Sequence, residues 1–338
     1  MAERLSDRLR EFLKTCEGRE VNLNYLRSEL KLDPNEPAWD GLRQYMRNLT
    51  DEKIVKPSGR HDGTYKVIKQ IKPVRVFIPG RERRPIFDLK FPRDYHTTEE
   101  MDFAEAITIR EGDMVTLGGV KSKGKTALCL NFCAENIDKH PVLMGNEYTS
   151  LVKGAHEPTP RFLNRLDEMS EWVEWVDEDG YDKFTLLPVR DDYAEHIVAD
   201  RINIIDWINL DANSLYDISK VIESIKSGLG KGIGIVALQK GEGVNNARGG
   251  QFVRDFSDVE LLLDSFGDNE DNVLLTVRGA KEKHKPIVGK TYAYTLTHSG
   301  TRIVDFREVK RCTACYGKGY NTRGTCDSCQ GTGYNDKA

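Results

Sequence analysis

Residues 119–126, GVKSKGKT, match the GxxxxGK[ST] pattern, the most chemically specific feature of the chain. Glycines in such a loop let the backbone wrap around phosphate groups, and amides at the start of the following helix point at the anion. A β-rich run, MVTLG, precedes the loop and a helical run, TALCLNFCAENI, follows it, which is the context that this chemistry requires. We expect Lys125 to reach the β- and γ-phosphates of ATP and Thr126 to ligate Mg²⁺. The expected nucleotide contacts in this segment are Gly119, Val120, Lys121, Ser122, Lys123, Gly124, Lys125, Thr126 and Ala127.

Two carboxylates complete the predicted nucleotide site. Asp206 leaves the apolar run INII, so we expect it at the end of a buried strand, where it holds Mg²⁺ together with Thr126. Glu147 ends the run PVLMGNE, and hydrolysis requires a group that orients or deprotonates the attacking water. Glu147 is the candidate for that role, and its alternative is a cap on the following helix.

Four cysteines near the C-terminus form two CxxC pairs separated by ten residues, the spacing of four thiolates around one tetrahedral Zn²⁺. Each pair continues into glycines, and this CxxCxGxG pattern resembles the zinc-binding repeats of DnaJ chaperones. The expected zinc ligands are Cys312, Cys315, Cys326 and Cys329. The purpose of the module is open between gripping nucleic acid, capping the fold and docking a protein. We expect Cys129 and Cys133, four residues apart in an apolar helix, to be buried hydrophobes rather than redox or metal groups.

The 338 residues are too many for one ordinary domain, and composition changes along the chain. Segment 101–306 has 11 more acidic than basic residues (34 against 23), although the whole chain has a net charge of only -4. The expected domains are 1–70, a basic Pro/Arg-rich linker at 71–100, a core at 101–306 and the cysteine module at 307–338. No apolar run has the length of a membrane span and the first residues lack a signal-peptide pattern, so we expect a soluble cytoplasmic protein without a membrane partner.

Residues 1–70 show three helical periods followed by two β-rich pieces around a glycine turn, the pattern of a winged helix-turn-helix domain. A third helix and a wing of this kind would offer DNA phosphates the basic side chains of Arg43, Arg47, Lys56 and Arg60. The alternative is a protein-docking module, because Asp40 and Asp51 dilute the positive charge.

Between residues 101 and 306, apolar β runs alternate with helical or polar stretches, which predicts an α/β domain with a largely parallel sheet of seven or eight strands. The expected strands are the runs MVTLGG, PVLMGN, FTLLPV, INIIDWINL, GIGIVALQ, VELLLD, NVLLTV and YAYTLTH.

This core resembles the RecA-type ATPases and, within them, the motor domain of DnaB-type hexameric replicative helicases. The resemblance rests on the phosphate loop, on IDWINL around Asp206, on Glu147, on VALQ ending at Gln239, and on RGG followed by DVELLL. It implies a RecA-like, mostly parallel sheet with flanking helices, and a catalytic glutamate and sensor glutamine at positions 147 and 239. It also implies a hexameric ring or filament with ATP at subunit interfaces, single-stranded DNA as ligand, and replication or recombination proteins as partners.

The segment KEKHKPIVG, residues 281–289, resembles the K-x-R-N-G-P-x-G segment of that family, whose basic residues act on the nucleotide of a neighbouring subunit. The resemblance makes Lys281 and Lys283 catalytic candidates in trans. Lys283 stands where arginine is expected, and an ammonium cannot make the planar bidentate contact of a guanidinium. The trans role is therefore open between Lys281, Lys283 and Arg278, and a solvated basic hairpin is the alternative.

A polar loop with few carboxylates, residues 240–254, follows Gln239 directly. It resembles the family's channel-facing loop, which makes Lys240, Arg248 and Arg254 candidate phosphate contacts, with an unliganded surface loop as the alternative. The sequence as a whole predicts an ATP-hydrolysing DNA helicase or translocase. Its alternatives are a recombination or repair filament that does not unwind DNA, and an ATP-gated regulatory or adaptor protein.

Overall fold

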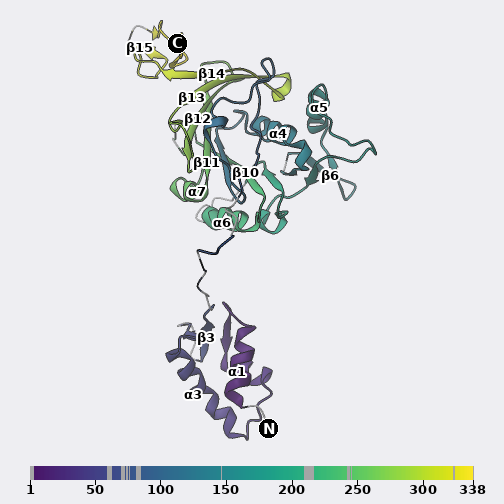
Figure 1. Cartoon of the computed structure of the whole chain (residues 1–338), viewed down its shortest axis with the longest axis vertical. Helices are drawn as coiled ribbons and strands as arrows, with labels where there is room; N and C mark the ends of the chain where they lie inside the picture. The colour runs from purple at the N-terminus through teal and green to yellow at the C-terminus, as the bar shows by residue number, and fades with distance from the viewer. Residues whose placement is uncertain are drawn as a thin grey trace. The chain divides into compact units, whose positions relative to one another are not determined.

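The computed structural model describes residues 4–58, 63–69, 73, 75, 77–80, 85–145, 147–208, 217–241, 244, 246–322 and 324–337. The chain divides into two compact units, Met1–Arg81 and Glu82–Ala338 (Figure 1). Arg60, expected to contact DNA, lies outside the described residues, as do positions 209 and 210 of the IDWINL motif. Within the described ranges, no helix is long and apolar enough to cross a membrane.

The first unit contains the three helices and the hairpin that the sequence predicts, with one further short strand. Strands β2 and β3 pair antiparallel, and β1 joins the other edge of β3, which gives the strand order β1-β3-β2. The helices bury one face each, with Leu9, Leu26 and Met46 fully inaccessible. Arg43 and Arg47 lie exposed on the other side of α3, and Lys56 is exposed on β2. The elements are α1 (Leu5–Lys14), β1 (Glu20–Asn22), α2 (Leu23–Glu29), α3 (Pro37–Asp51), β2 (Val55–Pro57) and β3 (Thr64–Val67).

The second unit is built on a mixed sheet of ten strands in the order β17-β14-β13-β12-β11-β4-β10-β9-β5-β8. The six strands from β11 to β8 are parallel, and the four others continue the sheet antiparallel. All eight predicted apolar runs form strands of this sheet. It is larger than expected because β14 and β17, which the apolar pattern did not reveal, extend its edge. The strands are β4 (Met114–Gly119), β5 (Val142–Met144), β8 (Thr185–Leu187), β9 (Ile202–Ile205), β10 (Ile233–Gln239), β11 (Val259–Ser265), β12 (Asn272–Ala280), β13 (Thr291–Thr297), β14 (Arg302–Arg311) and β17 (Tyr334–Asp336).

Helices cover both faces of the parallel part of the sheet, which explains why its strands are apolar on both sides. Along β10, Ile235 packs in the core that contains α4, whereas Val236 packs in the core that contains α6 and α7. Cys129 and Cys133 are buried in α4, as expected, and burial raises the pKa of each thiol. The helices are α4 (Lys125–Glu135), α5 (Pro160–Met169), α6 (Ile218–Gly228) and α7 (Gln251–Phe256), with 3-10 turns at Ala104–Ala106, Ile137–Lys139, Tyr193–His196 and His298–Gly300.

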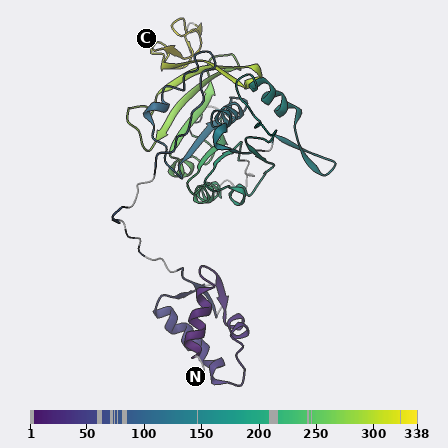
Figure 2. The same cartoon turned by 45° about the vertical axis from the view of Figure 1, so that its right-hand side comes forward.

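Two small antiparallel hairpins accompany the large sheet. One, formed by β6 (Thr149–Val152) and β7 (Ala155–Pro158), projects from the body of the unit in both views (Figures 1 and 2). The other, formed by β15 (Tyr320–Asn321) and β16 (Gly324–Thr325), lies in the cysteine module. Strand β14 spans the boundary expected at 306/307, and β17 returns from the module to pair with it, so the module continues the large sheet.

Candidate nucleotide and metal sites

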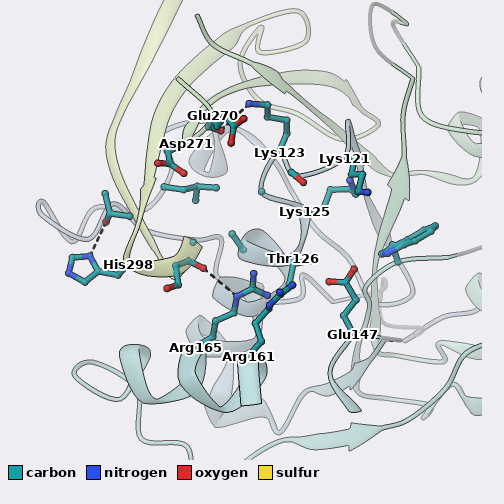
Figure 3. A pocket seen from close by; sticks show the side chains of 18 of the residues that line it. Lys121, Lys123, Lys125, Thr126, Glu147, Arg161, Arg165, Glu270, Asp271 and His298 are labelled. Carbon is teal, nitrogen blue, oxygen red and sulfur yellow. Dashed lines mark hydrogen bonds between the residues drawn. The ribbon is translucent and has the colours of Figure 1, made fainter. Parts of the chain in front are cut away.

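The predicted phosphate loop connects β4 to α4 and lines a cavity of about 670 Å³ (Figure 3). Gly124 has a φ of 79°, a left-handed conformation that a residue with a side chain rarely adopts, and α4 begins directly after it. A Cβ at Gly119 would lie 2.9 Å from Lys125 Cγ, so any side chain at this position would displace Lys125. The cavity brings together most of the expected nucleotide contacts, namely residues 121–127, with Glu147 and Gln239.

Lys125 is held inside the loop. Its Nζ donates hydrogen bonds to the carbonyl oxygens of Gly119, at 2.9 Å, and Val120, at 2.8 Å. Burial lowers the pKa of Lys125, while the nearby Asp206 carboxylate opposes that shift. Because a phosphate would offer the ammonium a charged partner in place of two neutral carbonyls, Lys125 fits the role of a phosphate ligand.

Asp206 follows the last residue of β9 and is 1% exposed. Tyr148 donates a hydrogen bond of 2.7 Å to its Oδ2. Burial raises the pKa of Asp206, and hydrogen bonds from Tyr148 and Thr126 oppose that shift. Its Oδ1 is buried without a hydrogen-bond partner among the described residues. A buried carboxylate that interacts with the Thr126 hydroxyl and keeps one oxygen without a partner among the described residues fits Mg²⁺ or one of its waters.

Glu147 lies in the loop after β5, and its side chain faces the cavity on the side of Lys125 and Thr126 (Figure 3). The alternative role of a helix cap is wrong, because Thr159 caps α5 by accepting a hydrogen bond from the Phe162 amide. Gln239 ends β10 opposite Gly119 in the sheet register, which places its side chain at the phosphate loop.

Four charged residues that no sequence motif indicated also line this cavity. Arg161 and Arg165 enter it from α5, where their spacing of four residues puts them on one helix face (Figure 3). Arg165 Nε donates to the carbonyl of Ser299 at 3.3 Å. Glu270 and Asp271 enter from the turn between β11 and β12. The spacing of the two arginines was the available signal, but it did not show which way the helix faces.

The basic segment after β12 lies at one end of the central strands, and the phosphate loop lies at the other end. Ala280 pairs with Val259 at the level of Val115, whereas Gly119 pairs with Leu263. These two levels are four residues apart along the strands, about 13 Å.

The trans candidates are held near the end of the strands that is far from the phosphate loop. Lys281 Nζ lies 3.1 Å from Asp258 Oδ1, and Lys283 Nζ donates to the Ala280 carbonyl at 3.4 Å. Neither lysine lines the cavity.

Lys240 is not an exposed phosphate contact, contrary to the sequence expectation. Its side chain is 2% exposed and forms an ion pair with Asp264 at the end of β11. Arg248 is exposed as expected, and Arg254 is partly exposed with its Nε 3.4 Å from the buried Glu260 carboxylate. Positions 242, 243 and 245 of the loop lie outside the described residues.

The four C-terminal cysteines form the second site, with all four sulfur atoms within 4.8 Å of one another and all four residues buried. The Sγ atoms of Cys312 and Cys326 are 3.9 Å apart, and those of Cys315 and Cys329 are 3.7 Å apart. A tetrahedron with Zn–S bonds of about 2.3 Å has edges of about 3.8 Å, so the spacing fits one Zn²⁺.

The glycines of the two CxxCxGxG pairs have structural roles in this site. The Gly319 amide donates to Cys315 Sγ at 3.3 Å, and the Gly333 amide donates to Cys329 Sγ at 3.2 Å. Both glycines have a φ of 77°, and a Cβ at Gly319 would lie 2.2 Å from the Gly331 carbonyl oxygen. The sequence pattern therefore follows from the close approach of the two pairs.

No protein-family model and no curated protein sequence matches the chain. Among solved structures, it is similar to one described as the crystal structure of the RadB recombinase, with a TM-score of 0.41 and 14% sequence identity. The match covers 58% of this chain and 91% of that one.

Proposed function

We propose that this protein is a RecA-type ATPase that acts on DNA. The observation that carries the proposal is the convergence in one cavity of the phosphate loop, Glu147 and Gln239, with the buried Asp206 carboxylate next to Thr126. Four parallel strands, β4, β5, β9 and β10, contribute these groups at their carboxyl ends, where sheets of this kind bind ligands.

In this proposal each residue has a defined task. Lys125 and the loop amides bind the phosphates, and Thr126 and Asp206 hold Mg²⁺, which neutralises charge on the phosphate oxygens when bound. Glu147 accepts a proton from the attacking water or orients it, and Gln239 senses the γ-phosphate. Arg161 and Arg165 add positive charge to the lining of the cavity.

A homo-oligomer is the proposed active form. Lys281 and Lys283 lie at the end of the central strands opposite the phosphate loop of their own chain. Their placement supports a role in trans, on a nucleotide bound by a neighbouring copy in a ring or filament.

DNA is the proposed ligand of the exposed basic side chains. Arg248 and Arg254 follow the sensor strand in the second unit, and Arg43, Arg47 and Lys56 lie on α3 and β2 of the first, the proposed winged helix. The finer proposal is a helicase or translocase that moves on single-stranded DNA. A recombination filament would bind DNA and hydrolyse ATP in the same way. An assay for unwinding of a forked duplex distinguishes a helicase from such a filament.

The proposal is tested by measuring ATP hydrolysis with and without single-stranded DNA, together with the mass of the assembly in the presence of an ATP analogue. We expect DNA to stimulate hydrolysis, Lys125→Ala to abolish nucleotide binding, and Glu147→Gln to retain binding but lose hydrolysis. A monomeric protein whose rate of ATP hydrolysis is the same with and without DNA would instead indicate an ATP-gated adaptor.

A further inference from the structure

The cysteine module contacts a turn that reaches the nucleotide cavity. Phe266 follows β11, is 6% exposed, and lies with its ring centroid 6.3 Å from that of Tyr334 on β17. Arg307 of β14 places its guanidinium 5.7 Å from the Phe266 ring and binds Asp336 of β17 at 2.7 Å. The turn after β11 is thus packed against the strand with which the module returns to the sheet.

The contact continues into the zinc-binding loops themselves. A Cβ added at Gly267 would lie 3.4 Å from Thr332 Cγ2, so the backbone of the turn closely approaches the second cysteine pair. Thr332 Oγ1 donates to the Cys329 carbonyl at 2.7 Å, and the next residue, Gly333, donates its amide to Cys329 Sγ. Cys329, an expected zinc ligand, is therefore three residues from Thr332 and five from Tyr334, the two residues that contact the turn.

At its other end, the turn holds part of the phosphate loop. The Glu270 carbonyl accepts a hydrogen bond of 2.9 Å from Lys123 Nζ, and the side chains of Glu270 and Asp271 line the cavity (Figure 3). The Phe266 amide donates to the Asn272 carbonyl at 3.3 Å and the Asn269 side chain accepts from the Asp271 amide at 3.0 Å, while the Asp271 carbonyl accepts from the Leu296 amide of β13 at 2.9 Å. One short hydrogen-bonded turn thus joins Phe266, which contacts the module, to the carbonyl that contacts Lys123.

We propose that the zinc-loaded cysteine module positions residues 266–271 at the nucleotide cavity through the Tyr334–Phe266 contact, so that zinc occupancy sets nucleotide affinity. The four thiolates hold the two cysteine loops together only when a metal offsets their mutual repulsion. Loss of zinc releases β17 and Tyr334, and the turn then loses its outer support. Tyr334 and Phe266 are positioning residues, and the inference rests on the nucleotide site proposed above.

The test compares the affinity of four full-length proteins for a fluorescent ADP analogue in Mg²⁺ buffer, with zinc content measured on each sample. They are the zinc-loaded wild type, wild type stripped with a zinc chelator and desalted, zinc-loaded Tyr334→Ala, and zinc-loaded Tyr320→Ala. Tyr320 is the matched control, because it is an exposed tyrosine of the same module on β15.

We expect stripping and Tyr334→Ala each to weaken binding about fivefold or more, the lower range of measured coupling between sites. Tyr320→Ala should bind like wild type, and Tyr334→Ala should retain one zinc per chain. Hydrogen exchange at residues 266–271 should increase in both weakened proteins. Phe266→Leu, which keeps an apolar side chain but removes the ring that contacts Tyr334, should weaken binding in the same direction as Tyr334→Ala.

Unchanged affinity after confirmed zinc loss, or wild-type affinity in zinc-loaded Tyr334→Ala, would overturn the coupling. Lys125→Ala separates this failure from that of the nucleotide site. If Lys125→Ala binds the analogue as wild type does, the proposed nucleotide site is wrong. If only Lys125→Ala loses binding, the nucleotide site is supported and only its coupling to zinc is refuted.

Discussion

Tyr148 donates a hydrogen bond of 2.7 Å to Asp206 Oδ2 inside the second unit, where both residues are 1% exposed. Among the described residues, Oδ1 has no hydrogen-bond partner, which makes it the oxygen available to Mg²⁺ or its water in the proposed site. In the proposed site, the Tyr148 hydroxyl would therefore position Asp206 as a metal ligand without itself contacting the metal.

Tyr148→Phe should weaken Mg²⁺-dependent nucleotide binding. A hydrogen bond to a charged group contributes about 1.5–3 kcal/mol, so we expect the dissociation constant to rise at least about tenfold. Titration of a fluorescent ADP analogue with and without Mg²⁺ measures the effect. The matched control is Tyr294→Phe, because the Tyr294 hydroxyl is also buried but has no hydrogen-bond partner in the described chain. Equal affinities in the two variants would contradict the positioning role.

The pH dependence of Mg²⁺-nucleotide binding should follow Asp206. Burial raises the pKa of this carboxyl, so on acidification it takes up a proton at a higher pH than an ordinary aspartate does. The protonated form binds Mg²⁺ poorly, and affinity should fall as the pH drops through the raised pKa. The free energy of unfolding of the ligand-free protein should instead increase as the pH drops. Burial favours the neutral carboxyl, and this contribution to stability is lost as the pH rises through the raised pKa.

Two further measurements check this assignment. Calorimetry in buffers of different ionisation enthalpy should detect proton release when Mg²⁺-nucleotide binds near that pH. In the wild type, the hydrogen bond from Tyr148 lowers the pKa of Asp206. Tyr148→Phe removes this bond, so the pKa should rise and the fall in affinity should occur at a still higher pH. An affinity that stays constant until the ordinary range of aspartate would show that Asp206 does not hold the metal.

The residues of the proposed nucleotide site could largely be brought together from the sequence, because the motifs that contain them are local. The residues from Gly119 to Thr126 are consecutive, and Asp206 and Glu147 each follow an apolar strand run, so the parallel sheet brings them to one edge. The cysteine cluster was predictable for the same reason, since spacing within each pair sets the ligand geometry.

The features that were missed depend on partners far away in the sequence. The sequence indicates Lys240 as an exposed loop lysine. In the structure it is buried in an ion pair with Asp264, which lies 24 residues later, near the end of β11. The spacing of the two arginines of α5 indicates that they share one face of the helix. Only the fold shows that this face lines the cavity. Strand β17 has three residues and forms because β14 offers it an open edge.

Arg165→Ala should weaken binding of ATP, because the lining of the cavity loses a guanidinium. We expect a loss of about tenfold, the size of one charge-assisted hydrogen bond, and a smaller loss for ADP, which carries less negative charge. Fluorescence titration with analogues of both nucleotides measures this difference. Arg201→Ala is the control, because Arg201 binds the His140 carbonyl at 2.9 Å and does not line the cavity. Equal losses in the two variants would show that Arg165 acts only through general charge.

Asp264→Asn should destabilise the second unit more than Lys240→Met does. The Lys240 side chain is 2% exposed, so removing its carboxylate partner leaves a buried ammonium unpaired, at a cost of about 3 kcal/mol. Asp264 is 31% exposed, and water can solvate it when Lys240 is replaced by an apolar side chain of similar length. Urea unfolding followed by tryptophan fluorescence gives both free energies. A Lys240→Met protein that is the less stable of the two would show that the lysine makes a contribution beyond its ion pair, and would reopen its role at the start of the 240–254 loop.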